Sequence, residues 1–303
     1  MKHRFIAVLS LVVGLSPLLP ARADEPSPEQ KAKLQKLLDL KASLHPRYGD
    51  VPVFISNAML HLGQDYYFLD APEAKKILVD GWGNPPDSTS NVLGMVFKDK
   101  TSFLDAQWGA VITFDGAGYV SDEDSKTADY DTVLADLKKG EEDDNAARVK
   151  QGYEPVRTIG WAQQPSYDSL HHSLVWARDL RFGNQTDDTL NYDVRVLGRQ
   201  GYLSLNMVSS MSQLPDVDTA AKKLASVAAY NSGSRYEDYN ASSDAKADYG
   251  LAGLVAAGVG VAVAKKLGFL ALLLAFGKKF FVIGFVIIAG LFSRVKRLFS
   301  RRS

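Results

Sequence analysis

Apolar and polar positions change period several times along the chain, and each period predicts a different kind of element. Four stretches have apolar residues at helical spacing: residues 28–44, residues 72–82, residues 130–137 and a run that begins at Pro215. Strand-like runs are found at residues 51–55, 59–69, 92–97, 110–114, 156–161, 171–177, 190–197 and 202–208. This mixture predicts an α+β fold in which an antiparallel sheet is flanked by helices.

The last two of these strands have the clearest pattern. Leucine, tyrosine and valine occupy every second position from Leu190 to Val196, while Asn191, Asp193 and Arg195 lie between them. Such alternation predicts one buried and one polar face. The short turn at residues 198–201 leads into the next strand, which predicts an antiparallel hairpin.

A long apolar tract, residues 249–292, changes the picture near the C-terminus. Lysine pairs at 265–266 and 278–279 divide it into runs shorter than the ~20 residues that span a bilayer. We expect one membrane crossing, or another odd number; the alternatives are a hairpin at the second lysine pair and a buried helix of a soluble protein. Five basic residues follow the tract: Arg294, Lys296, Arg297, Arg301 and Arg302. Such a cluster favours the cytoplasmic side.

The N-terminus reads as a secretory signal peptide. Basic residues precede an apolar run from Phe5 to Leu15, and Ala21-Arg22-Ala23 has the small-x-small pattern of a cleavage site. The expected organisation has five parts: a signal peptide (1–23), an exported α+β domain (24–230), a polar linker (231–248), a membrane anchor tract (249–292) and a basic cytoplasmic tail (293–303).

The charge distribution separates the domain from its ends. Three of the 35 basic residues precede residue 24 and nine follow residue 248, whereas all 35 acidic residues lie between, so that segment has a net charge of −12. An acidic domain is a poor nucleic-acid binder, and we expect no nucleic-acid partner. The chain has no cysteine, which excludes disulfides, thiol catalysis and cysteine-ligated metals.

Several short motifs carry a resemblance to a known family. In chain order they are Gly118-Tyr119-Val120, Gly160-Trp161-Ala162, Leu174-x-Trp176-Ala177, Leu190-Asn191-Tyr192 with Val194-Arg195, and Asp248-Tyr249-Gly250-Leu251. With them the chain resembles a bacterial family of predicted membrane-anchored proteins of unknown function. The resemblance implies a signal peptide, an envelope domain and a C-terminal anchor. It implies no activity and no site residue.

Candidates for acid–base chemistry are few. The chain has no P-loop, G-x-S-x-G, H-E-x-x-H or dinucleotide-binding motif. A hydrolase would have to use carboxylates such as Asp115 and Asp122 with His171 or His172. The two histidines are adjacent on a predicted strand, so their side chains point to opposite faces and cannot share a metal. His172 is expected to face inward as a hydrogen-bonded structural residue.

Two further groups of charged residues are candidate binding sites. Arg195 and Arg199 could clamp an anion, but ion pairs with the surplus of carboxylates are the expected role. The acidic residues near the glycine turn offer oxygen ligands but do not have EF-hand spacing: Asp122, Glu123, Asp124, Asp129 and Asp131. We expect no metal site and no cofactor.

The expected function is therefore a non-catalytic interaction or assembly module. It would lie in the bacterial inner membrane, with its main domain periplasmic and its tail cytoplasmic. Its partners would be the lipid bilayer, through residues 249–292, and either a second copy or an envelope protein. The alternative is an envelope hydrolase or a metal-binding domain that uses Asp and His residues.

Overall fold

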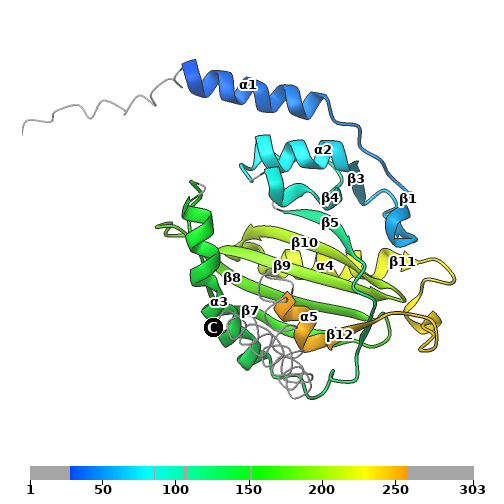
Figure 1. Ribbon diagram of the computed structural model, residues 1–303. Coiled ribbons are helices and arrows are strands. Elements are labelled where there is room, and N and C mark those ends of the chain that lie inside the picture. Colours follow the sequence, from blue (N-terminus) through cyan, green and yellow to red (C-terminus); the bar gives the residue numbers. More distant parts are fainter. Residues whose placement is uncertain (1–27, 85, 105–107, 151, 258–303) are drawn as a thin grey trace, which may run out of the picture.

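A seven-stranded antiparallel sheet forms the centre of the computed structural model (Figure 1). The structure describes residues 28–257 except for residues 85, 105–107 and 151. In spatial order the strands are β3 (Tyr66–Asp70), β4 (Val92–Lys98), β5 (Gly109–Asp115), β10 (Gly201–Ser210), β9 (Thr189–Gly198), β8 (Ser173–Phe182) and β7 (Val156–Asp168). Two meanders, β3 to β5 and β7 to β10, join where β5 pairs with β10. The predicted α+β class and antiparallel sheet are confirmed.

The predicted antiparallel hairpin of β9 and β10 is confirmed. Gly198 lies opposite Gly201, and Val194 lies opposite Leu205. The turn also touches the end of β5, because a Cβ at Gly201 would collide with the carbonyl oxygen of Asp115. Gly201 has a φ of 150°, so glycine is needed there both for conformation and for the close approach.

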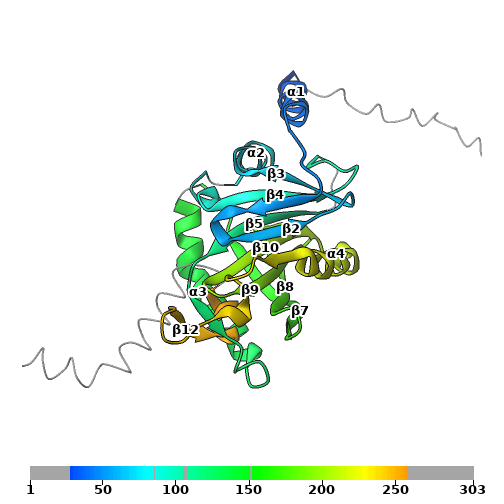
Figure 2. The same cartoon turned by 90° about the vertical axis from the view of Figure 1, so that its right-hand side faces the viewer.

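One face of the sheet, which we call the apolar face, is covered by a helix and a small second sheet. Helix α4 (Leu214–Val227) follows the short η4 (Met211–Gln213) and buries Val217, Ala221 and Leu224 against β9 and β10. The second sheet consists of β1 (Asp50–Val53), β2 (Ala58–His61) and β11 (Ala228–Tyr230), with η1 (Phe54–Ser56) between its first two strands. Figure 2 shows α4 and α3 on opposite sides of the large sheet.

The opposite face, which we call the mixed face, carries two separate apolar clusters. At the β3–β4 end lie α2 (Ala71–Lys76), the π-helical turn η2 (Ile77–Gly81) and η3 (Pro86–Thr89). At the β7–β9 end lie α3 (Tyr130–Lys150), β6 (Tyr119–Ser121), η5 (Tyr236–Asp238), β12 (Lys246–Gly250) and α5 (Leu251–Ala257). The strands β6 and β12 pair in parallel. The face between the two clusters is where the site described below lies.

Helix α1 (Pro28–Ala42) confirms the first predicted helix, but only one side of it meets the domain. Leu37 and Leu40, with Leu44 just beyond the helix, pack against the cluster at the β3–β4 end. Leu34 and Leu38 are exposed. Figure 1 shows α1 above α2, at the margin of the molecule.

Several predicted boundaries differ from the structure. The apolar run 59–69 is two strands in different sheets, because Gly63, with a φ of 59°, turns the chain between β2 and β3. Helix α3 continues past residue 137 through the acidic run, and β7 continues past residue 161. Strand β8 begins only at Ser173, because Asp168 accepts hydrogen bonds from the backbone of Leu170 and His171 and holds them in a turn.

Residues 231–248, predicted as a polar linker, pack on the domain instead. Tyr236 and Ala247 are buried in the cluster at the β7–β9 end, and β12 pairs with β6. The first residues of the apolar tract belong to the same body, since Leu251, Leu254 and Val255 of α5 are buried beside them. These residues look polar or membrane-like in sequence, but some of their partners lie more than 100 residues earlier, as in the bond from Tyr236 Oη to the carbonyl of Val120.

The membrane predictions concern mainly other residues. The predicted signal peptide (1–23), the tract from residue 258 to 292 and the basic tail lie outside the described residues. Within the described part of the chain, no helix is long and apolar enough to cross a membrane.

Candidate functional site

A polar belt separates the two apolar clusters of the mixed face. It comprises Arg178 on β8, Asn191, Asp193 and Arg195 on β9, and Asn206 on β10. Arg178 lies opposite Asn191, and Asp193 lies opposite Asn206, so the belt consists of cross-strand neighbours. Four of its five members are buried: Asp193 is 1% exposed and Arg178 is 8% exposed.

Hydrogen bonds join the belt into a chain. Arg178 Nη2 donates to Asn191 Oδ1 at 2.8 Å, and Asn191 Nδ2 donates to Asn206 Oδ1 at 3.2 Å. Asn206 Nδ2 then donates to Asp193 Oδ1 at 2.9 Å, which also accepts Arg195 Nη1 at 3.0 Å. The carboxylate of Asp193 is thus the buried anion that the rest of the belt surrounds.

The belt is not fully satisfied. Arg178 Nη2 and Asp193 Oδ2 are 4.0 Å apart, which is an ion pair without a hydrogen bond. Arg178 Nε, Arg195 Nε and Asp193 Oδ2 are buried and have no hydrogen-bonding partner among the described residues. Arg195 instead stacks over the Trp176 ring, with its guanidinium 4.8 Å from the ring centroid. The belt therefore keeps buried polar atoms without hydrogen bonds, which is unfavourable for stability.

A cavity of about 570 Å³, the α3 cavity, lies over one end of the belt. Arg178, Asn191 and Asn206 form its floor. Its walls come from α3 and the loop after it, from the segment that follows η2, and from the ends of β8 and β10; they include Trp82, Glu141, Asp144, Arg148, Tyr153, Glu154, Leu180, Phe182 and Val208. Both charge signs and several apolar groups therefore face one space.

Helix α3 is held over this cavity by side chains that complete the edge of the sheet. Asn145 donates to the carbonyl of Val156 and accepts from its amide, and Glu141 accepts from the amide of Thr158. Lys138 donates to the carbonyl of Ile159. Because β7 is an edge strand, these bonds also satisfy backbone groups that would otherwise be open to another chain.

Burial sets the electrostatics of the floor. It lowers the pKa of Arg178 below its usual value, because desolvation disfavours the charged form, while Asp193 acts in the opposite direction. Arginine stays charged at neutral pH even so. The floor therefore presents a desolvated cation, whose hydrogen bonds to a ligand are strong.

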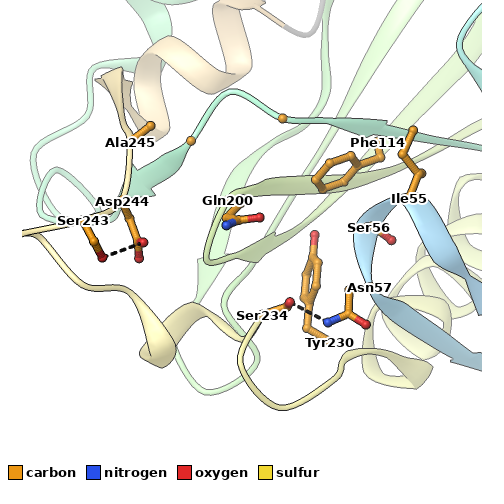
Figure 3. Close-up of a pocket in the computed structure, with 12 residues that line it drawn as sticks. Ile55, Ser56, Asn57, Phe114, Gln200, Tyr230, Ser234, Ser243, Asp244 and Ala245 are labelled. Carbon is orange, nitrogen blue, oxygen red and sulfur yellow. Dashed lines mark hydrogen bonds between the residues drawn. The ribbon is translucent and has the colours of Figure 1, made fainter.

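A second, smaller pocket of about 380 Å³, the Tyr230 groove, lies at the other end of the molecule (Figure 3). Ile55 and Phe114 line one side, Tyr230 and Gln200 the middle, and Ser243 and Asp244 the other side. Tyr230 donates to the carbonyl of Val196, and Asn57 Nδ2 donates to Ser234 Oγ at 2.7 Å. The groove is mostly uncharged, and its apolar rim is the exposed η1.

The histidines predicted as acid–base candidates lie in the turn before β8. His171 is exposed, with Nδ1 2.7 Å from Asp168 Oδ2. His172 is half-buried with a φ of 45°, and it stacks on the Tyr236 ring. The prediction that both histidines lie on a strand is wrong, but the hydrogen-bonded role predicted for His172 agrees with its contacts.

The two candidate carboxylates, Asp122 and Asp115, lie in different parts of the domain. Tyr167 Oη donates to Asp122 Oδ2 at 2.9 Å and lies 3.0 Å from His172 Nδ1, so this tyrosine links Asp122 to His172. Burial, then the bond to Asp122, raises the pKa of Tyr167 well above its usual range. Asp115 is elsewhere and accepts from Tyr202 Oη at 3.0 Å.

The two predicted anion-clamping arginines are both engaged by carboxylates. Arg195 is buried in the belt, and Arg199 makes two hydrogen bonds, of 2.7 and 2.9 Å, to Asp244. These are ion pairs, as the sequence favoured, although Asp193 is on the same strand as Arg195 and Asp244 is in a distant loop.

The acidic residues near the glycine turn mostly cap helices. Asp124 accepts from the amides of Leu251 and Ala252 at the start of α5, and Asp129 accepts from the amides of Asp131 and Thr132 at the start of α3. Across the described residues, no group of three His, Cys, Asp or Glu side chains is arranged to hold a metal ion.

The sequence reasoning missed the floor and walls of the α3 cavity. Arg178, Asn206 and Glu141 were not among the candidates. Arg178 was missed because the strand was ended at residue 177; extending its alternation by one residue would have placed Arg178 beside Asn191. Glu141 begins a run of four acidic residues, whose pattern alone does not indicate a cavity wall.

Comparison with known proteins identifies a family but no activity. No curated protein matches the chain. Among solved structures, the solution structure of cyanobacterial PsbP (CyanoP) from Synechocystis sp. PCC 6803 is 10% identical and covers 63% of this chain and 94% of its own, with a TM-score of 0.35. The Ran-binding protein Mog1p from Saccharomyces cerevisiae is 8% identical and covers 61% of this chain and 95% of its own, with a TM-score of 0.27. A family model described as a protein of unknown function (DUF2167) matches residues 45–289. Since this is most of its length, the chain belongs to the DUF2167 family of proteins of unknown function.

Proposed function

We propose that this protein is a membrane-anchored, non-catalytic interaction module of the bacterial envelope, whose folded domain faces the periplasm and whose tail lies in the cytoplasm. The N-terminal cleavage pattern and the basic cluster after the apolar tract support this topology. Because α5 belongs to the domain, the proposed anchor begins after Ala257, within residues 258–292.

The observation that carries the interaction role is an apolar tip on the acidic domain. Phe54 is 86% exposed and Ile55 is 68% exposed on η1, and Ile55 continues into the Tyr230 groove beside Phe114 and Tyr230. Adjacent exposed apolar residues next to a groove are typical of a protein-binding surface. The net charge of −12 on residues 24–248 disfavours self-association, so the proposed occupant is an apolar segment of a different envelope protein.

Site-specific photo-crosslinking in intact membranes tests this role. A photoreactive residue at position 54 should give one heteromeric product, identified as the same envelope protein in independent preparations. The matched control is position 170, because Leu170 is 81% exposed but is not part of the groove. A product with the mass of a dimer of this chain would replace the proposal by self-assembly. The same product from both positions would show that the tip is not specific.

Reporter fusions test the topology separately. Alkaline phosphatase fused after Ala257 should be active, and the same enzyme fused after Ser303 should be silent. Deleting residues 1–23 should silence the first fusion, which controls for the signal. Activity of both fusions would mean that the tract does not cross the membrane an odd number of times.

A second candidate function, hydrolysis of an envelope component, rests on the link between Asp122, Tyr167 and His172. A histidine oriented by a second group that is itself held by a carboxylate is the arrangement of a general base. If this role exists, hydrolase activity of the full chain should be lost in His172→Ala and kept in His171→Ala. Activity that survives both changes removes this candidate.

A further inference from the structure

We propose that the α3 cavity binds an uncharged, polyhydroxylated ligand of the size of a disaccharide. This inference does not depend on the proposed function, because the cavity is lined by none of the residues of the apolar tip. It rests on three features of the cavity: a buried cation with polar neighbours in its floor, walls of both charge signs, and apolar surfaces beside them.

The floor offers hydrogen-bond donors to a ligand. Arg178 is more than nine-tenths buried, lines the cavity and donates to Asn191 through Nη2. Its Nε is enclosed by the protein, so a ligand would meet the guanidinium group through its Nη atoms. Asn191 and Asn206 lie beside it in the floor, and their amide N–H groups are further donors.

The walls require a partner that donates hydrogen bonds. Glu141, Asp144 and Glu154 line the cavity, and a carboxylate is an acceptor only. Among the described residues that line the cavity, two cations, Arg148 and Arg178, balance these three anions in part. The lining is therefore slightly acidic, which disfavours a phosphate, a sulfate or another anion as the ligand.

Hydroxyl groups satisfy both requirements at once. Each hydroxyl donates one hydrogen bond and accepts two, so adjacent hydroxyls can receive from the arginine floor and donate to the acidic wall. An anion can only accept hydrogen bonds from the floor, and an ammonium group can only donate them to the acidic wall. A site built from buried polar groups in this way also rejects ligands that leave those groups unpaired.

The remaining lining suits the carbon framework of a sugar. Leu180, Phe182 and Val208 lie at the ends of their strands beside the floor, and Trp82 and Tyr153 lie on the walls. These side chains offer apolar contact area to the C–H faces of a ring. The volume of about 570 Å³ is within the range of pockets that enclose small-molecule ligands.

Calorimetric titration of the full chain tests the inference. The protein should be held in a detergent without a sugar headgroup and titrated with maltose, cellobiose and chitobiose. At least one of these neutral disaccharides should bind saturably with a Kd in the millimolar range or below. A dipeptide and a sulfated disaccharide serve as the zwitterionic and anionic probes, and both should bind more weakly.

Two variants locate the binding without breaking the belt. Val208→Trp fills the cavity from a half-exposed strand position and should abolish binding; Ile159→Trp is its matched control on β7, outside the cavity. Asp144→Asn should weaken binding roughly tenfold, since a hydrogen bond to a charged group is lost. Glu142→Gln changes an α3 residue that does not line the cavity, and this variant should bind the disaccharide like the unaltered chain.

Three results would overturn the inference. The first is no saturable binding of any of the three neutral disaccharides. The second is binding that Val208→Trp leaves unchanged although the variant unfolds like the unaltered protein. The third is tighter binding of the dipeptide or of the sulfated disaccharide, which would assign the cavity to a charged ligand.

Discussion

The two faces of the large sheet are made of the same strands but differ in the residues that they bury. On the apolar face, alternate residues of β9 and β10 form a continuous core under α4 and the small sheet. On the mixed face, the intervening residues of the same strands form the polar belt, flanked by two separate clusters. A buried ion pair is often no more stabilising than apolar residues of the same volume. Stability therefore explains the first face, and the second needs another explanation, which the α3 cavity offers.

The largest effect is expected when the anion of the belt is removed. Asp193→Ala leaves Arg178 and Arg195 buried without their counter-charge, and this should lower the free energy of unfolding by about 3–5 kcal/mol. Urea unfolding of the full chain measures it. Asp187→Ala, an exposed aspartate of the β8–β9 loop, is the control and should change little. A loss as small as that of the control would mean that water already compensates the belt.

A truncation on the apolar face should cost slightly less. Leu205 is fully buried at the centre of β10, so Leu205→Ala should lower the free energy of unfolding by about 2–5 kcal/mol, depending on how far the core closes around the cavity. Its comparison is Val208→Ala on the same strand, where the side chain is half-exposed on the mixed face and the loss should be small. Equal losses at the two positions would contradict the division into two faces.

Replacing the whole charged group should have a smaller effect on stability than breaking it. We expect Arg178→Met, Asp193→Leu and Arg195→Met together to unfold within about 2 kcal/mol of the unaltered chain, in either direction. The same variant should lose disaccharide binding in the calorimetric titration. If this variant kept both its full stability and its disaccharide binding, the belt would be needed neither for the fold nor for the ligand.

Ion pairs outside the two faces should matter least, and mainly through pH. Two hydrogen bonds from Arg199, and then the amide of Asn240, hold the pKa of Asp244 below its usual value. Because the pKa of Asp244 is lower in the folded than in the unfolded chain, its ion pair stabilises the fold fully above pH ~4. This stabilisation is lost as the pH falls through the pKa of the folded state. The difference in unfolding free energy between the unaltered chain and Arg199→Gln should therefore be largest at neutral pH and shrink in acid. Lys223→Gln, an exposed lysine of α4, should show no such pH dependence.

The sequence predicted the parts of this fold that depend on local pattern. The alternation from Leu190 to Val196 correctly assigned the apolar face of β9, and the turn at residues 198–201 correctly predicted the hairpin. The intervening polar residues were predicted on an outward face, but they are buried under the elements of the mixed face. Helix α4 was also predicted from Pro215 and its apolar spacing. In each case the decisive contacts lie within a few residues or on the adjacent strand.

The parts that could not be predicted depend on distant partners. Strands β6 and β12 are short, and they pair across more than 100 residues. Helix α3 passes through Gly140, which disfavours a helix, but hydrogen bonds between β7 and the side chains of Lys138, Glu141 and Asn145 hold it. The α3 cavity depends on this placement, so its lining could not be assembled from single-residue candidates.

The seam between β5 and β10 also affects how the chain can fold as it is synthesised. The seam pairs Asp115 with Tyr202, 87 residues later, whereas each meander on its own is built from sequence neighbours. At a synthesis rate of about 5–20 residues per second, β5 waits roughly 4–17 s for its partner. During that time the edge of β5 that later pairs with β10 is open, and the core around Ala110 and Ile112 lacks the residues of β8, β9, β10 and α4. This edge is the part of the nascent chain that a chaperone would need to shield.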